Sequence, residues 1–276
     1  MVVLIQLLSF WPIWRWYGDR MLDGSDEPWG IFALLCSVMI IVMRLKEEGR
    51  TGQKRQAANI VSDIVPPFAP IGRIRCHLPS LGFLLFSVLY ITTYQWTPFL
   101  VKGVLVISAL TGLHLRTMKG GTAIYALLLL SLPLVSSLEF YLGYPLRLVL
   151  SYIVAILLRY GGGFNVAAEG TVLNWDGSIV IVDAPCSGIK MLWVGMFINF
   201  LLASLMKFSA RQTLIATAFA LRAIFVGNVV RVTLLFFKES GMVPLPSWTH
   251  AGIGVVCFTG AAVCITSRNR RLGHVA

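Results

Sequence analysis

The chain has 276 residues, of which 57% are hydrophobic and 13% are charged, and its formal net charge is +11. A soluble domain usually carries about 25% charged residues, so this composition excludes an ordinary soluble protein. Apolar residues also form long runs such as 121–140 and 213–237, and a helix needs about 20 of them to cross a bilayer. The sequence therefore predicts one integral membrane domain over residues 1–276.

The positive charge is distributed in short segments between the apolar runs. The longest is a predicted cytoplasmic loop at 45–79, and three further basic clusters lie at 116–119, 207–211 and 268–271. Lys and Arg accumulate in this way in the cytoplasmic loops of membrane proteins. We therefore expect these basic segments to lie in the cytoplasm, the lipid bilayer to surround the apolar helices, and no nucleic-acid partner.

The apolar runs predict an all-α multipass fold of about eight transmembrane helices. In chain order these cover 1–17, 29–44, 80–95, 98–115, 120–141, a helix from about Cys186 to Lys207, 212–237 and 249–267. One further apolar segment, 144–160, would put the next loop on the wrong side if it crossed. Because it carries Arg147 and Arg159, we predict an amphipathic helix at the outer interface.

The segment 161–185 differs from the rest of the chain and is predicted to lie outside the cytoplasm. Two runs rich in β-branched residues, 171–173 and 179–182, flank Asp176-Gly177. An Asp-Gly pair between such runs is a strong signal for a β-hairpin with a two-residue turn. We expect a small hairpin that leads directly into the next membrane helix.

That helix is expected to begin at Pro185-Cys186, since proline suits the first turn of a helix. Free N–H groups and the helix dipole would then stabilise a thiolate at Cys186. Lys190, at i+4, would add a second positive charge on the same face. The alternative is a buried, inert cysteine. The five cysteines are odd in number and contain no Cys-x-x-Cys pair, which argues against a disulfide framework or a structural zinc site.

Arg231 lies inside the apolar run 213–237, with Asn228 three residues earlier on the same helix face. A charge inside a membrane helix costs about 3 kcal/mol or more and is by default a functional-site hypothesis. The alternative is an arginine that only anchors its helix at the interface. Near the start of the last predicted helix stands His250, a residue type that is more often structural than catalytic in such a position.

The predicted topology brings Cys186, Arg231 and His250 to the outer ends of three different helices. A thiol nucleophile, a proton carrier and a fixed cation are the groups that thiol-based acyl transfer requires. We therefore expect these three side chains to share one pocket.

At these residues the sequence resembles the exosortase/archaeosortase family, over a core of about 80–267. The similar elements are Ala184-Pro185-Cys186-Ser187-Gly188-Ile189-Lys190, Asn228-Val229-Val230-Arg231-Val232, and His250 with Gly252 and Gly254. The resemblance implies a bacterial inner-membrane cysteine peptidase or transpeptidase. Such an enzyme cleaves C-terminal sorting signals of membrane-anchored substrates, as in PEP-CTERM proteins, on the periplasmic side, and it accompanies exopolysaccharide production.

The resemblance also implies roles for individual residues. Cys186 would be the nucleophile, His250 the general acid and base, and Arg231 the cation that stabilises the oxyanion or orients the substrate. Supporting roles fall to Asn228, Ser187, Gly188 and Lys190, and no metal or cofactor is implied.

Two other readings stay open from the residues alone. The protein could be a non-enzymatic polytopic membrane protein, such as a transporter or an exopolysaccharide assembly scaffold, although no clear internal repeat supports a transporter. It could also be another membrane thiol acyltransferase. The reactivity of Cys186 toward reagents outside the cell separates the enzyme readings from the non-enzymatic one.

Overall fold

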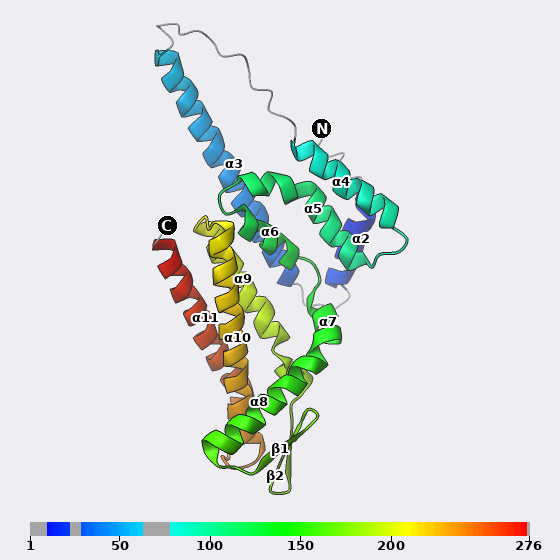
Figure 1. Ribbon diagram of the computed structural model, residues 1–276, viewed down its shortest axis with the longest axis vertical. Helices are drawn as coiled ribbons and strands as arrows, with labels where there is room; N and C mark the ends of the chain where they lie inside the picture. The colour runs from blue at the N-terminus through cyan, green and yellow to red at the C-terminus, as the bar shows by residue number, and fades with distance from the viewer. Residues whose placement is uncertain (1–9, 23–28, 63–77, 275–276) are drawn as a thin grey trace.

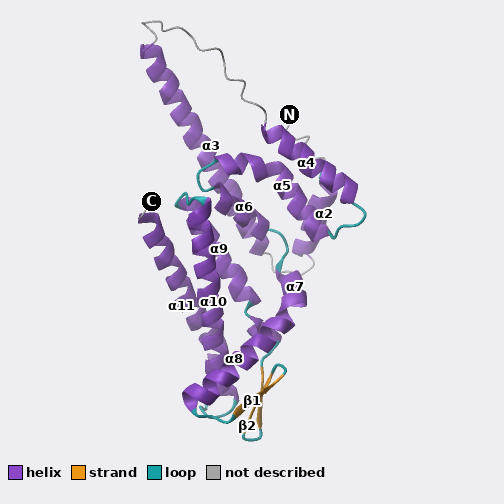
Figure 2. Cartoon of the chain, in the orientation of Figure 1, coloured by secondary structure: helices purple, strands orange, loops and turns teal. Residues whose placement is uncertain are grey.

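The computed structural model describes residues 10–22, 29–62 and 78–274 (Figure 1). Its helices are α2 (Trp11–Leu22), α3 (Trp29–Ser62), α4 (Leu78–Thr93), α5 (Phe99–Thr117), α6 (Gly121–Leu130), α7 (Val135–Leu138), α8 (Tyr144–Gly162), α9 (Ile189–Leu205), α10 (Ala210–Glu239) and α11 (Thr249–His274). Residues 1–9 of the first predicted helix lie outside the described part. The strands lie together at one end of the molecule (Figure 2) and form the only sheet among the described residues, which has three strands.

The centre of the fold is a bundle of α9, α10 and α11, which lie side by side in Figure 1. Two hydrogen bonds between polar side chains connect the three helices. The Asn269 amide of α11 donates to Asn199 Oδ1 of α9 at 3.2 Å, and the Asn199 amide donates to Thr217 Oγ1 of α10 at 3.2 Å. Polar side chains buried between membrane helices are satisfied by such bonds, which hold the helices in one register.

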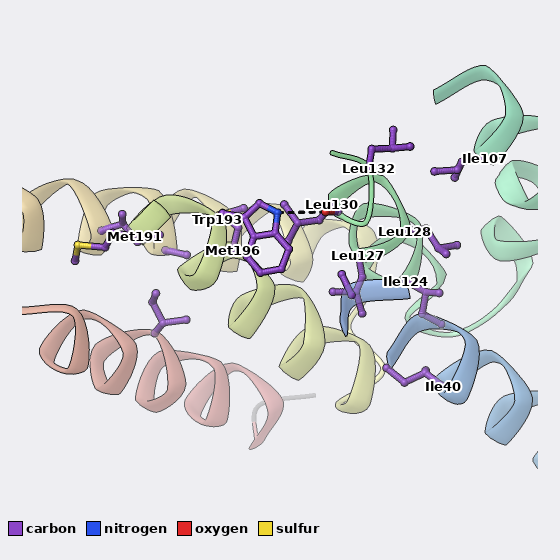
Figure 3. Close-up of a cluster of buried hydrophobic side chains, with 14 of the residues drawn as sticks. Ile40, Ile107, Ile124, Leu127, Leu128, Leu130, Leu132, Met191, Trp193 and Met196 are labelled. Atoms are coloured by element: carbon purple, nitrogen blue, oxygen red, sulfur yellow. Dashed lines mark hydrogen bonds between the residues drawn. The ribbon is translucent and has the colours of Figure 1, made fainter. Parts of the chain in front are cut away.

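A large apolar cluster joins this bundle to α6 and α3 (Figure 3). Ile124 and Leu127 of α6 and Ile40 of α3 are fully buried in it. The Trp193 indole N–H donates to the Leu130 carbonyl at the end of α6, at 3.3 Å. The cluster therefore fixes α9, whose first residues follow the candidate site, against the N-terminal half.

Charged residues gather where α9 ends, away from the sheet. Arg44 of α3 is buried and donates to the Ser204 carbonyl in the last turn of α9 at 2.8 Å. Glu47 accepts from Arg44 at 3.2 Å and from Lys207 at 2.9 Å. Arg44 and Lys207, which come from two of the basic segments predicted to share one side of the membrane, therefore meet at the end of α9.

The chain is a multipass membrane protein, but the predicted total of about eight spanning helices is not established. Within the described ranges, four helices are long and apolar enough to cross a membrane: Trp29–Glu47, Val135–Gly161, Ala210–Glu239 and Thr249–His274. Shorter apolar helices cover Phe83–Thr93, Phe99–Thr111, Gly121–Leu130 and Ile189–Leu205.

Two predicted boundaries are wrong. The helix predicted at 120–141 ends at Leu130, because Pro133 has no N–H to continue the ladder and disfavours helical geometry before it. The loop predicted at 45–79 is helical up to Ser62 in α3, and α4 begins at Leu78. The intervening residues 63–77 lie outside the described part.

The segment predicted as a separate interfacial helix, 144–160, is instead the second half of a longer helix. A π-helical turn, Glu139–Gly143, joins α7 to α8 without a break, so the apolar run Val135–Gly161 is long enough to span. Figure 1 shows α8 inclined to α10 and α11 at the end that carries the sheet. A π-turn adds one residue to a helix and is frequent at functional sites.

The predicted hairpin is confirmed and gains a third strand. Strands β1 (Val166–Glu169), β2 (Val172–Trp175) and β3 (Ser178–Ile181) form an antiparallel sheet in the order β1-β2-β3. Asp176 and Gly177, both with positive φ, make the two-residue turn between Trp175 and Ser178. Positive φ at both positions matches the twist of the strands, which is why Asp-Gly is favoured there.

Candidate functional site

The turn that follows β3 carries Cys186. Residues Ala184–Ser187 form one 3-10 turn, in which the Cys186 N–H donates to the Asp183 carbonyl at 2.8 Å. Gly188 then takes a left-handed conformation with φ 84°, and α9 begins only at Ile189. The prediction that Cys186 lies inside the opening turn of the helix is therefore wrong, because the left-handed residue Gly188 separates the Cys186 turn from α9.

The break in helical geometry at Gly188 also changes the expected position of Lys190. Cys186 and Lys190 do not belong to one helix, so the i+4 relation between them does not exist. The ammonium of Lys190 instead lies 6.0 Å from the centre of the Trp29 ring. The second predicted cation beside the thiol is thus directed to α3.

Asn228 of α10 forms a hydrogen bond with this turn. Its side-chain amide is buried and donates to the Cys186 carbonyl at 3.1 Å. A Cβ atom at Gly188 would lie 2.4 Å from the same amide nitrogen, so this position must be glycine for the turn to approach α10. Glycine here meets two demands, the left-handed backbone and the close contact.

Arg231, one turn further along α10, contacts the same turn. Its Nη1 donates to the Pro185 carbonyl at 3.0 Å, and a Cβ at Gly254 of α11 would lie 3.4 Å from its Nε. The guanidinium is therefore packed between the Cys186 turn and α11. Asn228 and Arg231 together tie two consecutive carbonyls of the turn to one helix.

His250, in the first turn of α11, and Cys186 line one cavity of about 360 Å³. The wall also includes Asp183 before the thiol turn and Glu239 at the end of α10. His250 Nδ1 lies 3.1 Å from Glu239 Oε1. The structure thus brings Cys186 and His250 to one cavity, whereas Arg231 contacts the Cys186 turn at the same end of the bundle without lining that cavity.

Cys186 is buried, with only 5% of the residue exposed. Burial raises the pKa of this thiol above its ordinary value, because a thiolate loses hydration there. The positive charge of Arg231 lowers the same pKa, whereas the carboxylate of Asp183 raises it. At neutral pH the group is therefore mostly a thiol, and its activation requires a base.

Two acidic residues of this region were not identified from the sequence. The Ser187 hydroxyl donates to Glu139 Oε2 at 2.8 Å, which links the π-turn before α8 to the Cys186 turn. The other acid is Glu239, the partner of His250. A signal existed for Glu139, since it is the only acidic residue between 121 and 158, in a strongly apolar stretch.

Among the residues that the structure describes, no group of three or more His, Cys, Asp or Glu side chains lies close enough together to hold a metal ion. The four cysteines within those ranges, Cys36, Cys186, Cys257 and Cys264, are free thiols.

A comparison with protein families matches residues 1–267 to the transmembrane exosortase family. Neither a curated protein nor a solved structure gives a significant match. The match covers nearly the whole chain, including the Cys186 turn, both helix segments that contact it and the α11 start. On this basis the chain belongs to the transmembrane exosortase family.

Proposed function

We propose that the protein is a membrane-embedded cysteine peptidase or transpeptidase that cleaves C-terminal sorting signals of exported proteins through a thioester. Membership of the exosortase family supports the substrate class. The observation that carries the chemistry is the cavity that Cys186 and His250 share, although they come from segments far apart in the sequence. A thiol and an imidazole at one cavity are the pair that nucleophilic acyl transfer needs.

In the first step His250 takes the proton of the Cys186 thiol, and the sulfur attacks the scissile carbonyl carbon. The C–S bond forms while the electron pair of the C=O bond moves to oxygen. The resulting tetrahedral intermediate collapses, the C–N bond breaks, and the imidazolium returns its proton to the leaving amine. The buried thiol, with its raised pKa, makes this base necessary.

Arg231 supplies the fixed positive charge for the oxyanion. One of its N–H groups is used by the Pro185 carbonyl, but a guanidinium has five donors in a planar fork. Its Nε is buried and has no hydrogen-bond partner among the described residues. A preorganised donor aimed at developing negative charge is usually the largest contribution to such catalysis.

In the second step an amine, a hydroxyl group or water attacks the thioester carbonyl. His250 removes the proton of the acceptor, the C–S bond breaks, and the sulfur leaves as a thiolate that recovers the proton. Transfer to an amine or hydroxyl makes the reaction a transpeptidation or esterification, and water makes it a hydrolysis.

The proposed location is the bacterial inner membrane, with the sheet and the Cys186 turn on the periplasmic side. Arg44 and Lys207 support this orientation, because they lie at the opposite end of α9 from the Cys186 turn. The basic residues at 268–271 in the last turns of α11 fit the same side. Lys and Arg are retained in the cytoplasm.

The test uses the full chain co-expressed with a reporter that carries a motif, an apolar helix and a basic tail taken from a protein of the same genome. We expect Cys186→Ala and Cys186→Ser to abolish the shift of the reporter to lower mass. In the active protein, hydroxylamine should release the reporter from a covalent adduct. Normal processing by Cys186→Ala would overturn the proposal.

A further inference from the structure

We infer that Glu239 is the positioning residue of His250, so that the reactive centre is a Cys–His–Glu arrangement and not a Cys–His pair alone. The inference deepens the proposed function and rests on it. Glu239 lies at the end of α10, eleven residues before His250, and lines the same cavity as His250 and Cys186.

The contact between the two side chains fixes the imidazole. Glu239 Oε1 lies 3.1 Å from His250 Nδ1, within hydrogen-bond distance. A carboxylate can only accept, so the proton must sit on Nδ1. This tautomer leaves Nε2 as the nitrogen that can take the proton of Cys186.

The helix ends show why His250 needs an anion during the reaction. His250 is in the first turn of α11, where the positive end of the helix dipole disfavours a positively charged imidazole. The proton transfer from Cys186 creates that charge. Glu239 offsets the dipole at the moment when the imidazolium forms.

Glu239 itself stands where local electrostatics disfavour an acid, in the last turn of α10 near the negative end of its dipole. A position that breaks a local rule is more often functional than one that follows it. Lys238 compensates in part, since its ammonium lies 2.8 Å from the same Oε1 atom.

Four other charged or titratable groups surround this pair and must be held constant in any test. Lys238 contacts Glu239 directly, while Asp183 and Cys186 line the cavity from the thiol turn. Arg231 lies between that turn and α11.

The experiment compares Glu239→Gln, Glu239→Asp, His250→Gln and the double variant in the full chain. Two rates are measured: reporter processing, and alkylation of Cys186 by iodoacetamide in a background where the other cysteines are replaced. We expect Glu239→Gln to slow both rates on the order of 10-fold or more with an unchanged KM, because a misoriented imidazole loses part of an acid–base contribution of roughly 100-fold or more. Removing the Glu239 carboxylate by itself lowers the pKa of the Cys186 thiol and would speed alkylation, so slower alkylation reports the loss of the positioned imidazole. Glu239→Asp keeps the charge and should restore most of the rate.

The double variant distinguishes a positioning role from a structural one. If Glu239 acts through His250, Glu239→Gln should cause no further slowing of alkylation in the His250→Gln background. One control removes a carboxylate that does not line the cavity and should keep the wild-type rate within about 2-fold: Glu169→Gln on the exposed face of β1.

The failures of the two proposals differ. If Cys186→Ala is inactive but Glu239→Gln processes and alkylates at the wild-type rate, or if its loss multiplies with that of His250→Gln, the inference is overturned and the proposed function stands. If Cys186→Ala still processes the reporter, the proposed function is overturned, and the alkylation cycle still decides whether Glu239 acts through His250.

Discussion

The amide of Asn228 donates to the Cys186 carbonyl at 3.1 Å, so a residue inside a membrane helix holds the backbone of the proposed nucleophile. Asn228 is buried, and the turn it holds is a 3-10 turn of only four residues, Ala184–Ser187. The position of the Cys186 backbone therefore depends on α10 as well as on the turn itself.

Replacing Asn228 by leucine should leave the Cys186 carbonyl buried without a donor. An unsatisfied buried carbonyl costs about 1–3 kcal/mol, so we expect a lower melting temperature and a processing rate reduced at least 10-fold. Thr233→Val is the matched control on the same helix, because its hydroxyl bonds only to the Val229 carbonyl of that helix. Equal effects of the two substitutions would contradict the assigned role.

Gly188→Ala tests the close approach of the thiol turn to α10. The substitution adds a left-handed backbone cost of roughly 1–2 kcal/mol and a Cβ that would lie 2.4 Å from the Asn228 amide. Gly163→Ala is the control, since Gly163 has φ 71° but no atom within 4 Å of its would-be Cβ. We expect Gly188→Ala to abolish processing while Gly163→Ala only lowers the melting temperature; similar activities would contradict the contact.

Local chemistry made part of this site predictable. The two-residue turn could be predicted because Asp-Gly is itself the preferred sequence for it, and the structure contains this turn between Trp175 and Ser178. The order of Cys186, Arg231 and His250 between basic segments also predicted a common end, because charge sets which side each loop occupies.

The prediction failed where two signals competed. Hydropathy favoured one helix over 120–141, and Pro133 inside it argued for a break that the structure contains. In the same way Pro185 suggested a helix start, but Gly188 delays α9 until Ile189. Hydropathy reports burial in lipid, whereas these two boundaries are set by backbone geometry.

The two acidic partners were not predictable from local pattern. Glu139 and Ser187 are 48 residues apart, and the Glu239–His250 pair depends on how the loop after α10 folds back. The two residues of each pair belong to different elements, so only the packing of those elements brings the groups together.

Two charged neighbours shift the pKa of the Cys186 thiol in opposite directions, so replacing them should change its alkylation rate in opposite directions. Arg231 lowers this pKa and Asp183 raises it, while burial raises it most. At a fixed pH near 8, Arg231→Gln should therefore slow alkylation of Cys186 several-fold, and Asp183→Asn should speed it, because only the thiolate reacts.

A pH series of alkylation rates checks the same point. The rate should still rise above the ordinary thiol pKa of about 8.5, since the pKa in the protein is higher. Asp176→Asn, at the exposed tip of the hairpin, serves as the control and should leave the curve unchanged. Shifts of the same sign in the Arg231 and Asp183 variants would refute the electrostatic assignment.

The bond between Ser187 and Glu139 couples α8 to the thiol turn, and a double-mutant cycle measures that coupling. A hydrogen bond to a charged group contributes about 1.5–3 kcal/mol, so Ser187→Ala and Glu139→Ala should each lower the melting temperature and slow processing. The double variant should be no worse than either single one, because both remove the same bond. Ser151→Ala, whose hydroxyl bonds only within α8, should have little effect. Additive losses would mean that Glu139 acts on the site by another route, since a single shared bond cannot be lost twice.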